Sequence, residues 1–138
     1  MNKENKHATR LLLVDTDAML RGTLCLMFSD AGYEVHQASN GFEALKIHRR
    51  QPVDVVIAEL VLPVKDGFQT MMELRRESMS PKFIAIAGSR HLAAEVYLRT
   101  AEVLGAHRIL AKPFEPGQLL AMVQQVLDTD KQIPPPVF

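Results

Sequence analysis

Short apolar runs alternate along the chain with stretches in which apolar residues recur every three or four positions. The runs are typical of buried strands, and the three- to four-residue recurrence is typical of helices with one buried face. Strands are predicted at residues 11–14, 34–38, 53–60, 82–87 and 108–111. A helical stretch follows each of them, and the helices are predicted to end before Gly32, Pro52 and Pro81, at Leu104 and at Leu127.

Polar residues and apolar spacing define the predicted helices further. Asp17 and Asn40 precede the first two helices and are candidate N-caps. Gly88 and Ser89 open the fourth helix, and residues 115–127 form the last. The apolar face of the first helix is expected to comprise Met19, Leu20, Thr23, Leu24, Met27 and Phe28, and comparable faces in the second and fourth helices include Phe42, Leu45, Ile47, Leu92, Val96, Ala101 and Leu104.

Five strand–helix pairs without an internal repeat predict one α/β domain with a doubly wound, five-stranded parallel sheet. Nearly continuous apolar strands fit a sheet that helices cover on both faces. We place the domain at residues 11–127, with a flexible N-terminus at 1–10. The Pro-rich segment 128–138 is a flexible tail, either a frayed end or the start of a polyproline-like linker.

Composition narrows the class of protein. The 138 residues suit one domain, and an apolar fraction of 47% excludes a disordered chain. A formal net charge of zero argues against nucleic-acid binding. No apolar run approaches the ~18 residues of a membrane span, and the start of the chain does not resemble a signal peptide. We therefore expect a cytoplasmic protein without a nucleic-acid or membrane partner. The five histidines lack metal-ligand spacing and are expected at the surface or at strand edges.

Chemistry is expected where the strands end, because the carboxyl ends of parallel strands meet at one edge of the sheet. Asp15, Thr16 and Asp17 follow the first strand, Glu59 ends the third, and Lys112 follows the fifth. Carboxylates facing a lysine could hold Mg²⁺ or a phosphoryl group.

At these residues the chain resembles the CheY-like receiver domains of two-component response regulators. The resemblance lies in the segments LLVDTD, DVVIAELVLPVKDG and GAHRILAKPF, and it covers residues 11–127. It implies a flavodoxin-like fold with strand order 2-1-3-4-5. It also implies a phosphorelay in which an aspartate accepts a phosphoryl group beside Mg²⁺.

Several residues depart from the pattern that the resemblance implies. The pair of adjacent acids reads Asp15-Thr16, so one Mg²⁺ ligand is missing. Glu59 stands at the phosphoacceptor aspartate. The switch residues, a hydroxyl on the fourth strand and an aromatic ring on the fifth, are replaced by Ala87 and Ile109. Only Asp15 and Lys112 match.

These departures predict a changed pocket. Asp15 and Glu59 are at most the remaining metal ligands, so no cofactor is expected beyond weakly bound Mg²⁺. Asp17 could replace the missing acid, or it could be only a helix cap. Glu59 is expected to pair with Lys112. That pair could be a structural plug, could imitate the phosphorylated state, or could leave residual phosphoryl or metal binding.

We interpret the chain as a stand-alone atypical receiver (a pseudo-receiver) that is not an enzyme and signals by protein contacts. The alternatives are a conventional receiver that a histidine kinase still phosphorylates, and a small flavodoxin-like binding protein or enzyme. The expected partner is a kinase or a downstream effector at the face of the fourth helix, fifth strand and fifth helix, and a homodimer is possible. Ala87 and Lys112 are 25 positions apart, which indicates an extra helical turn or a longer loop between them. Exposed candidates on this face are Arg90, His91, Glu95, Tyr97, Arg99 and Glu102.

Overall fold

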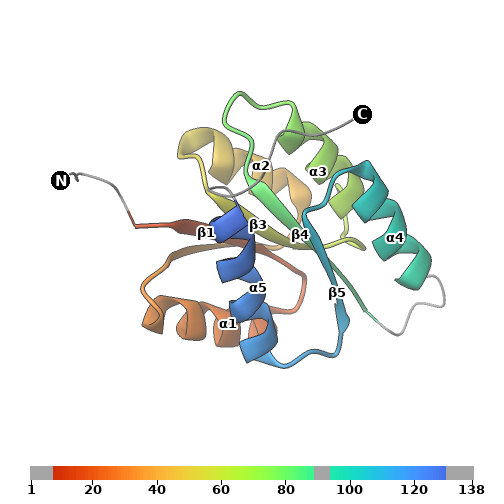
Figure 1. Ribbon diagram of the computed structural model, residues 1–138. Coiled ribbons are helices and arrows are strands. Elements are labelled where there is room, and N and C mark those ends of the chain that lie inside the picture. The colour runs from red at the N-terminus through yellow and green to blue at the C-terminus, as the bar shows by residue number, and fades with distance from the viewer. Residues whose placement is uncertain (1–7, 89–93, 130–138) are drawn as a thin grey trace.

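The structure, a computed structural model, describes residues 8–88 and 94–129 of the chain. Strands and helices alternate throughout these residues (Figure 1). The strands are β1 (Arg10–Val14), β2 (Glu34–Ala38), β3 (Val55–Glu59), β4 (Lys82–Gly88) and β5 (Arg108–Lys112). The helices are α1 (Ala18–Asp30), α2 (Gly41–Arg50), α3 (Gly67–Arg75), α4 (Ala94–Leu104) and α5 (Pro116–Thr129).

The five strands form one parallel sheet in the order β2-β1-β3-β4-β5, as predicted. The register of the sheet aligns the carboxyl ends of strands that are far apart in the sequence. Glu59, the last residue of β3, lies opposite Ile86 of β4, and Gly88 of β4 lies opposite Lys112 of β5. The carboxyl ends of β3 and β5 therefore share one edge of the sheet.

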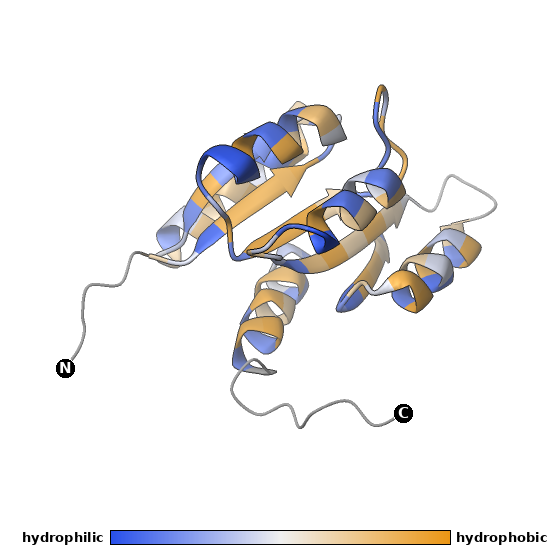
Figure 2. Ribbon diagram, turned by 90° about the horizontal axis from the view of Figure 1, so that it is seen from above, coloured by the Kyte–Doolittle hydropathy of each residue, from blue (hydrophilic) through white to orange (hydrophobic). Residues whose placement is uncertain are grey.

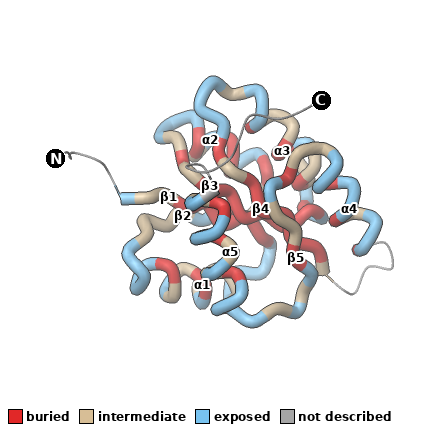
Figure 3. Tube along the Cα trace, viewed as in Figure 1, coloured by how far each residue is buried: buried red, intermediate tan, exposed pale blue. Residues whose placement is uncertain are grey.

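Helices cover both faces of the sheet. Helices α1 and α5 lie on one face, and α2, α3 and α4 lie on the other (Figure 1). Alternate strand residues supply the two cores: Leu11 and Leu13 pack under α1 and α5, whereas Leu12 and Val14 pack with the other three helices. The central strands β1, β3 and β4 are hydrophobic along most of their length (Figure 2) and form the buried centre of the molecule (Figure 3). Burial on both faces explains why the sequences of these three strands do not alternate.

Three helices begin at an acidic or amide N-cap. The side chains of Asp17, Asn40 and Asp66 accept hydrogen bonds from backbone N–H groups in the first turns of α1, α2 and α3, at 2.9 to 3.0 Å. The predicted caps Asp17 and Asn40 are thus confirmed. The chain leaves α1 through Gly32, whose φ of 98° is a conformation that favours glycine.

The prediction of the apolar helix faces is wrong at several residues, which are exposed and not buried. Met19, Phe42 and Val96 are 84%, 64% and 63% exposed. Each lies in the first turn of its helix, at the carboxyl edge of the sheet, where an apolar side chain has less strand surface beneath it. Thr23 is also exposed, because it lies about 100° around the helix from the buried Leu24.

The predicted boundaries need small corrections. Strand β1 includes Arg10, whose backbone N–H donates to the Asp54 carboxylate at 2.8 Å, and α5 includes Asp128 and Thr129. Strand β3 is shorter than predicted, while β4 and β5 each extend one residue further. Helix α4 comprises Ala94–Leu104, and Gly88, where this helix was predicted to start, is the last residue of β4. Ser89 and the predicted core residue Leu92 lie outside the described residues. The remaining terminal residues, 1–7 and 130–138, also lie outside them, and their flexibility stays a prediction.

His48 corrects the expectation that histidines lie at the surface or at strand edges. It is buried on α2, where its Nδ1 accepts from the Val53 backbone N–H at 3.1 Å and its Nε2 lies 2.9 Å from the Met79 carbonyl oxygen. These partners assign the proton to Nε2, because Nδ1 must accept. Burial lowers the pKa of His48 below its usual 6.5, which the hydrogen bond to Met79 offsets only in part.

Within residues 8–88 and 94–129, no helix is long and apolar enough to cross a bilayer.

Candidate functional site

The carboxyl edge of the sheet brings two buried carboxylates onto one ammonium group. Lys112 Nζ lies 2.8 Å from Asp15 Oδ2 and 2.8 Å from Glu59 Oε1. Asp15 follows β1, Glu59 ends β3 and Lys112 ends β5, so three strands of the sheet build the cluster. Asp15 and Glu59 are each only 6% exposed. The predicted pair of Glu59 and Lys112 is therefore present, and Asp15 completes it.

The second oxygen of each carboxylate is turned toward the backbone. Asp15 Oδ1 accepts from the N–H of Asp17 at 2.9 Å, and Glu59 Oε2 lies 3.4 Å from the N–H of Val61. Both acids thus have a partner at each oxygen. Buried acidic side chains are usually found with such partners, because a polar group without one is costly to bury.

Electrostatics keep Lys112 charged. Burial, the largest single influence, would lower the pKa of this lysine. The hydrogen bonds and negative charges of Asp15 and Glu59 together outweigh burial and raise the pKa above its usual 10.5. The ammonium form therefore persists at neutral pH.

The other predicted site residues do not join this cluster. Thr16 and Asp17 are exposed, and the Asp17 carboxylate caps α1 instead of facing Lys112. Ala87 is fully buried in β4 and offers no hydroxyl group. Ile109 is half-buried against the core that contains α2, α3 and α4. The structure thus unites Asp15, Glu59 and Lys112 and leaves Thr16 and Asp17 at the rim.

Arg21 supports the cluster and was not predicted. Its guanidinium donates to the backbone carbonyl of Asp15 through Nη1 and to Gln37 Oε1 through Nε at 3.2 Å. It thereby joins the loop after β1 to β2. A basic residue within the apolar stripe of α1, one turn after Asp17, was the sequence signal for this role.

The family model of the response regulator receiver domain matches residues 11–124. The chain belongs to this family. As a receiver domain it is a component of two-component signal transduction. Such domains interact with histidine kinases and effector domains and are generally signalling modules, not enzymes.

The curated relatives that the chain matches are larger proteins. The chain is 36% identical over 126 residues to "Probable transcriptional regulator ycf27" of Cyanidium caldarium, covering 91% of this chain and 49% of that protein. It is 35% identical over 123 residues to "Sensor kinase CckA" of Brucella abortus, covering 88% of this chain and 13% of the kinase. The receiver thus spans about half the length of the regulators it matches, or less.

Solved structures share the receiver fold. The chemotaxis response regulator CheY4 of Vibrio cholerae superposes with a TM-score of 0.76 at 29% identity, over 87% of this chain and 99% of that one. A CheY-like receiver domain protein from Methanospirillum hungatei gives a TM-score of 0.79 at 24% identity, over 91% of this chain and 98% of that one. The second likeness concerns the fold alone.

The residues of this receiver pocket do not fit the Mg²⁺ site that the family implies. Mg²⁺ requires several oxygen ligands in octahedral geometry. Here Asp15 and Glu59 direct one oxygen each to the Lys112 ammonium, and Thr16 supplies no carboxylate. Across the described part of the chain, no three His, Cys, Asp or Glu side chains are placed to share a metal ion.

The predicted partner face of the receiver is described in part. Glu95, Arg99 and Glu102 are exposed on α4. Tyr97 is not an exposed candidate, because it is half-buried and its ring meets Phe68 edge to face at 6.0 Å. Arg90 and His91 fall in 89–93, outside the described residues, and the predicted extra turn or longer loop within residues 88–102 stays a prediction.

Proposed function

We propose that this receiver is an atypical one, which signals through protein contacts without an aspartyl-phosphate cycle. The observation that carries the proposal is the bridging position of Lys112, 2.8 Å from both Asp15 and Glu59. A carboxylate must approach a phosphoryl donor with its oxygen aligned and free to attack. The Glu59 oxygens instead face the ammonium group and the Val61 N–H.

The surrounding residues support the same conclusion. The glutamate side chain is one methylene longer than the aspartate that the resemblance implies, so its carboxylate sits further from β3. Ala87 has no hydroxyl to bind a phosphoryl oxygen, and Ile109 has no ring to couple the pocket to the surface. Mg²⁺ binding is weak at most, because the missing carboxylate at Thr16 removes a charged ligand.

The ion pairs favour a pocket held in one state. Glu59 places negative oxygens on Lys112, as a phosphorylated aspartate would, although with less charge and fewer acceptor atoms. The domain would then present one constitutive surface to a histidine kinase or a downstream effector, in the cytoplasm. We place that surface at α4, β5 and α5, where a homodimer could also form.

The test compares the wild-type chain with variants that restore the missing groups. The series is Glu59→Asp, the double variant Glu59→Asp/Thr16→Asp, and the triple variant that adds Ala87→Thr, with Glu59→Gln as the control without an acceptor. Each is treated with acetyl phosphate and Mg²⁺ and examined by intact mass spectrometry. A parallel amide NMR titration uses beryllofluoride with Mg²⁺.

We expect no phosphoryl adduct and no saturable shifts for the wild type and Glu59→Gln. The restored variants gain an adduct stepwise, most strongly in the triple variant. A wild-type adduct that Glu59→Gln lacks would overturn the proposal and establish a conventional receiver with a modified pocket.

A further inference from the structure

The loop that follows Glu59 contains a strained turn. Val64 has a φ of 65°, and among residues 8–88 and 94–129 it is the only non-glycine residue with a positive φ. The Lys65 N–H donates to the Pro63 carbonyl at 2.6 Å, which closes a three-residue turn around Val64. A β-branched residue is disfavoured in this conformation. Val64 is also 85% exposed, so burial of its side chain does not offset the strain.

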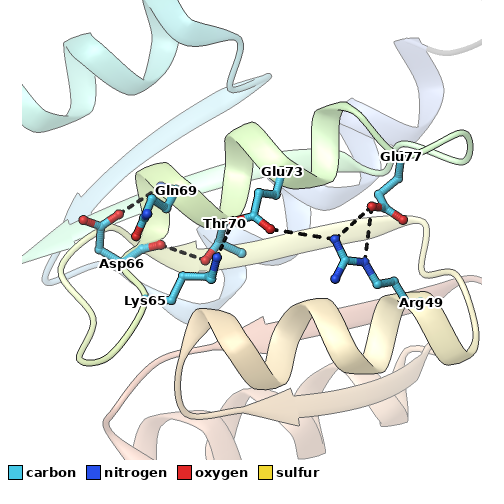
Figure 4. Close-up of polar contacts among 7 residues, drawn as sticks. All are labelled: Arg49, Lys65, Asp66, Gln69, Thr70, Glu73 and Glu77. Carbon is cyan, nitrogen blue, oxygen red and sulfur yellow. Dashed lines mark hydrogen bonds and ion pairs between the residues drawn. The ribbon is translucent and has the colours of Figure 1, made fainter.

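Contacts to α2 and α3 hold the residues beside Val64. The Lys65 ammonium pairs with the Glu73 carboxylate on α3, and the Lys65 carbonyl accepts from the Gly41 N–H at the start of α2, at 3.1 Å. Figure 4 shows that Glu73 also contacts α2: Arg49 of α2 lies 3.7 Å from the Glu73 carboxylate and 3.2 Å from the Glu77 carboxylate. The hydrogen bond from Lys65 lowers the pKa of Glu73, which keeps this carboxylate charged.

The same loop, residues 60–66, is tightly joined to the pocket. The Val61 N–H faces the Glu59 carboxylate, and the Gly67 N–H donates to the Leu60 carbonyl at 2.9 Å. A Cβ at Gly67 would lie 2.5 Å from the Glu59 carbonyl oxygen, so the backbone at Gly67 packs directly against the backbone of Glu59. A change in the loop therefore reaches Glu59 directly.

We propose that the Lys65–Glu73 ion pair holds the loop in its strained turn, and that breaking this pair relaxes the loop and alters how Glu59 holds Lys112. The inference rests on the proposed function, since it names a regulation of the same pocket. Its route leaves the pocket through the loop after β3 toward α2 and α3. Strain maintained by surrounding contacts is what allows a local release to shift a conformation.

Two charge-neutralising variants test the coupling. Glu73→Gln removes the charged partner of Lys65. The matched control Glu77→Gln neutralises a nearby carboxylate, which contacts Arg49 and not Lys65. Backbone amide and Lys112 side-chain NMR spectra are recorded without Mg²⁺ or a phosphoryl donor. We expect Glu73→Gln to shift Val61, Gly67 and Lys112, and Glu77→Gln to leave them in place. Shifts confined to α2 and α3 in both variants would overturn the proposal.

Thermal unfolding tests the strain independently. Val64→Gly removes the steric conflict, so its Tm should rise, whereas Val61→Gly in the same loop, without a positive φ, should lower the Tm. In the Glu73→Gln background the gain from Val64→Gly should shrink, because the turn has already relaxed. A lowered Tm for Val64→Gly, or an unchanged gain in that background, contradicts the inference. Since neither experiment involves a phosphoryl group, failure of the proposed function would leave both results interpretable.

Discussion

Lys112 is the residue on which the pocket depends, because two carboxylates with little access to water share its ammonium group. Removing Lys112 leaves both carboxylates without a charge partner, whereas removing either carboxylate leaves the other paired with Lys112. Removing one partner of a buried ion pair costs far more than the intact pair contributes, since the remaining charge is buried and uncompensated.

Replacing Lys112 with a similar-sized apolar side chain measures this dependence. We expect Lys112→Met to lower the free energy of unfolding by about 3 kcal/mol at neutral pH, the low end for a buried pair because the lysine side chain is 24% exposed. Urea denaturation gives the value. The double variant Lys112→Met/Glu59→Gln should recover part of the loss, as one stranded charge is removed. Wild-type stability in Lys112→Met would show that the ion pairs contribute little.

The sequence predicted some residue contacts and missed others for a physical reason. Glu59 and Lys112 could be paired in advance because both stand at carboxyl ends of parallel strands, where topology alone brings them together. The Lys65–Glu73 pair depends on where α3 begins and on an unusual turn at Val64. His48 binds backbone atoms of residues 53 and 79, which no side-chain pattern marks.

At the scale of elements, hydrophobic periodicity was sufficient to predict the strands, the helices and their alternation along the chain, whereas the strand order in the sheet came from the resemblance to receiver domains. Buried strands and amphipathic helices each leave a distinct spacing of apolar residues. The spacing could not show where a helix runs past its strand, so it wrongly placed Met19 and Phe42 in the core. It also could not show how closely α2 approaches the loop after β3.

That close approach gives a prediction for two glycines. A Cβ at Gly41, the first residue of α2, would lie 1.8 Å from Thr70 Oγ1 and 2.7 Å from the Lys65 carbonyl oxygen. Thr70 cannot turn aside freely, because its hydroxyl donates to the Asp66 carbonyl at 2.7 Å. We expect Gly41→Ala to destabilise the domain by about 1–3 kcal/mol, as overpacking does.

Gly22 is the matched control, because it lies inside α1 and a Cβ at this position would meet nothing within 4 Å. Gly22→Ala should stabilise the domain by about 0.5–1 kcal/mol through helix propensity. Guanidinium denaturation measures both variants. If Gly41→Ala were as stable as Gly22→Ala, the packing of α2 against the loop would be looser than described.

Across the whole molecule, the polar side chains at the carboxyl edge of the sheet and those at its amino edge make different kinds of contact. The carboxyl edge holds Asp15, Glu59 and Lys112 and the strained loop. The amino edge holds His48, which joins α2 to the segments that precede β3 and β4. Polar groups at the first edge are arranged around Lys112, whereas those at the second connect elements of the fold.

The histidine makes the stability of the whole domain depend on pH. Its pKa is lower in the folded state than its usual 6.5, so the unfolded chain binds more protons as the pH falls below that value. The free energy of unfolding is then greatest above about pH 6.5 and decreases as the pH falls toward the folded-state pKa. Protonation at Nδ1 would also leave that nitrogen facing the Val53 N–H, donor against donor.

Urea denaturation of the wild type and His48→Gln between pH 7.5 and pH 5 isolates this contribution. Glutamine can accept from Val53 and donate to Met79, yet it does not titrate in this range. We expect the wild type to lose more stability on acidification than the variant, with the difference developing below about pH 6.5. Equal pH dependence in the two proteins would mean that His48 takes up its proton in the folded state as readily as in the unfolded chain. The hydrogen bonds at Nδ1 and Nε2 make that outcome unfavourable, because only the neutral ring satisfies both of them.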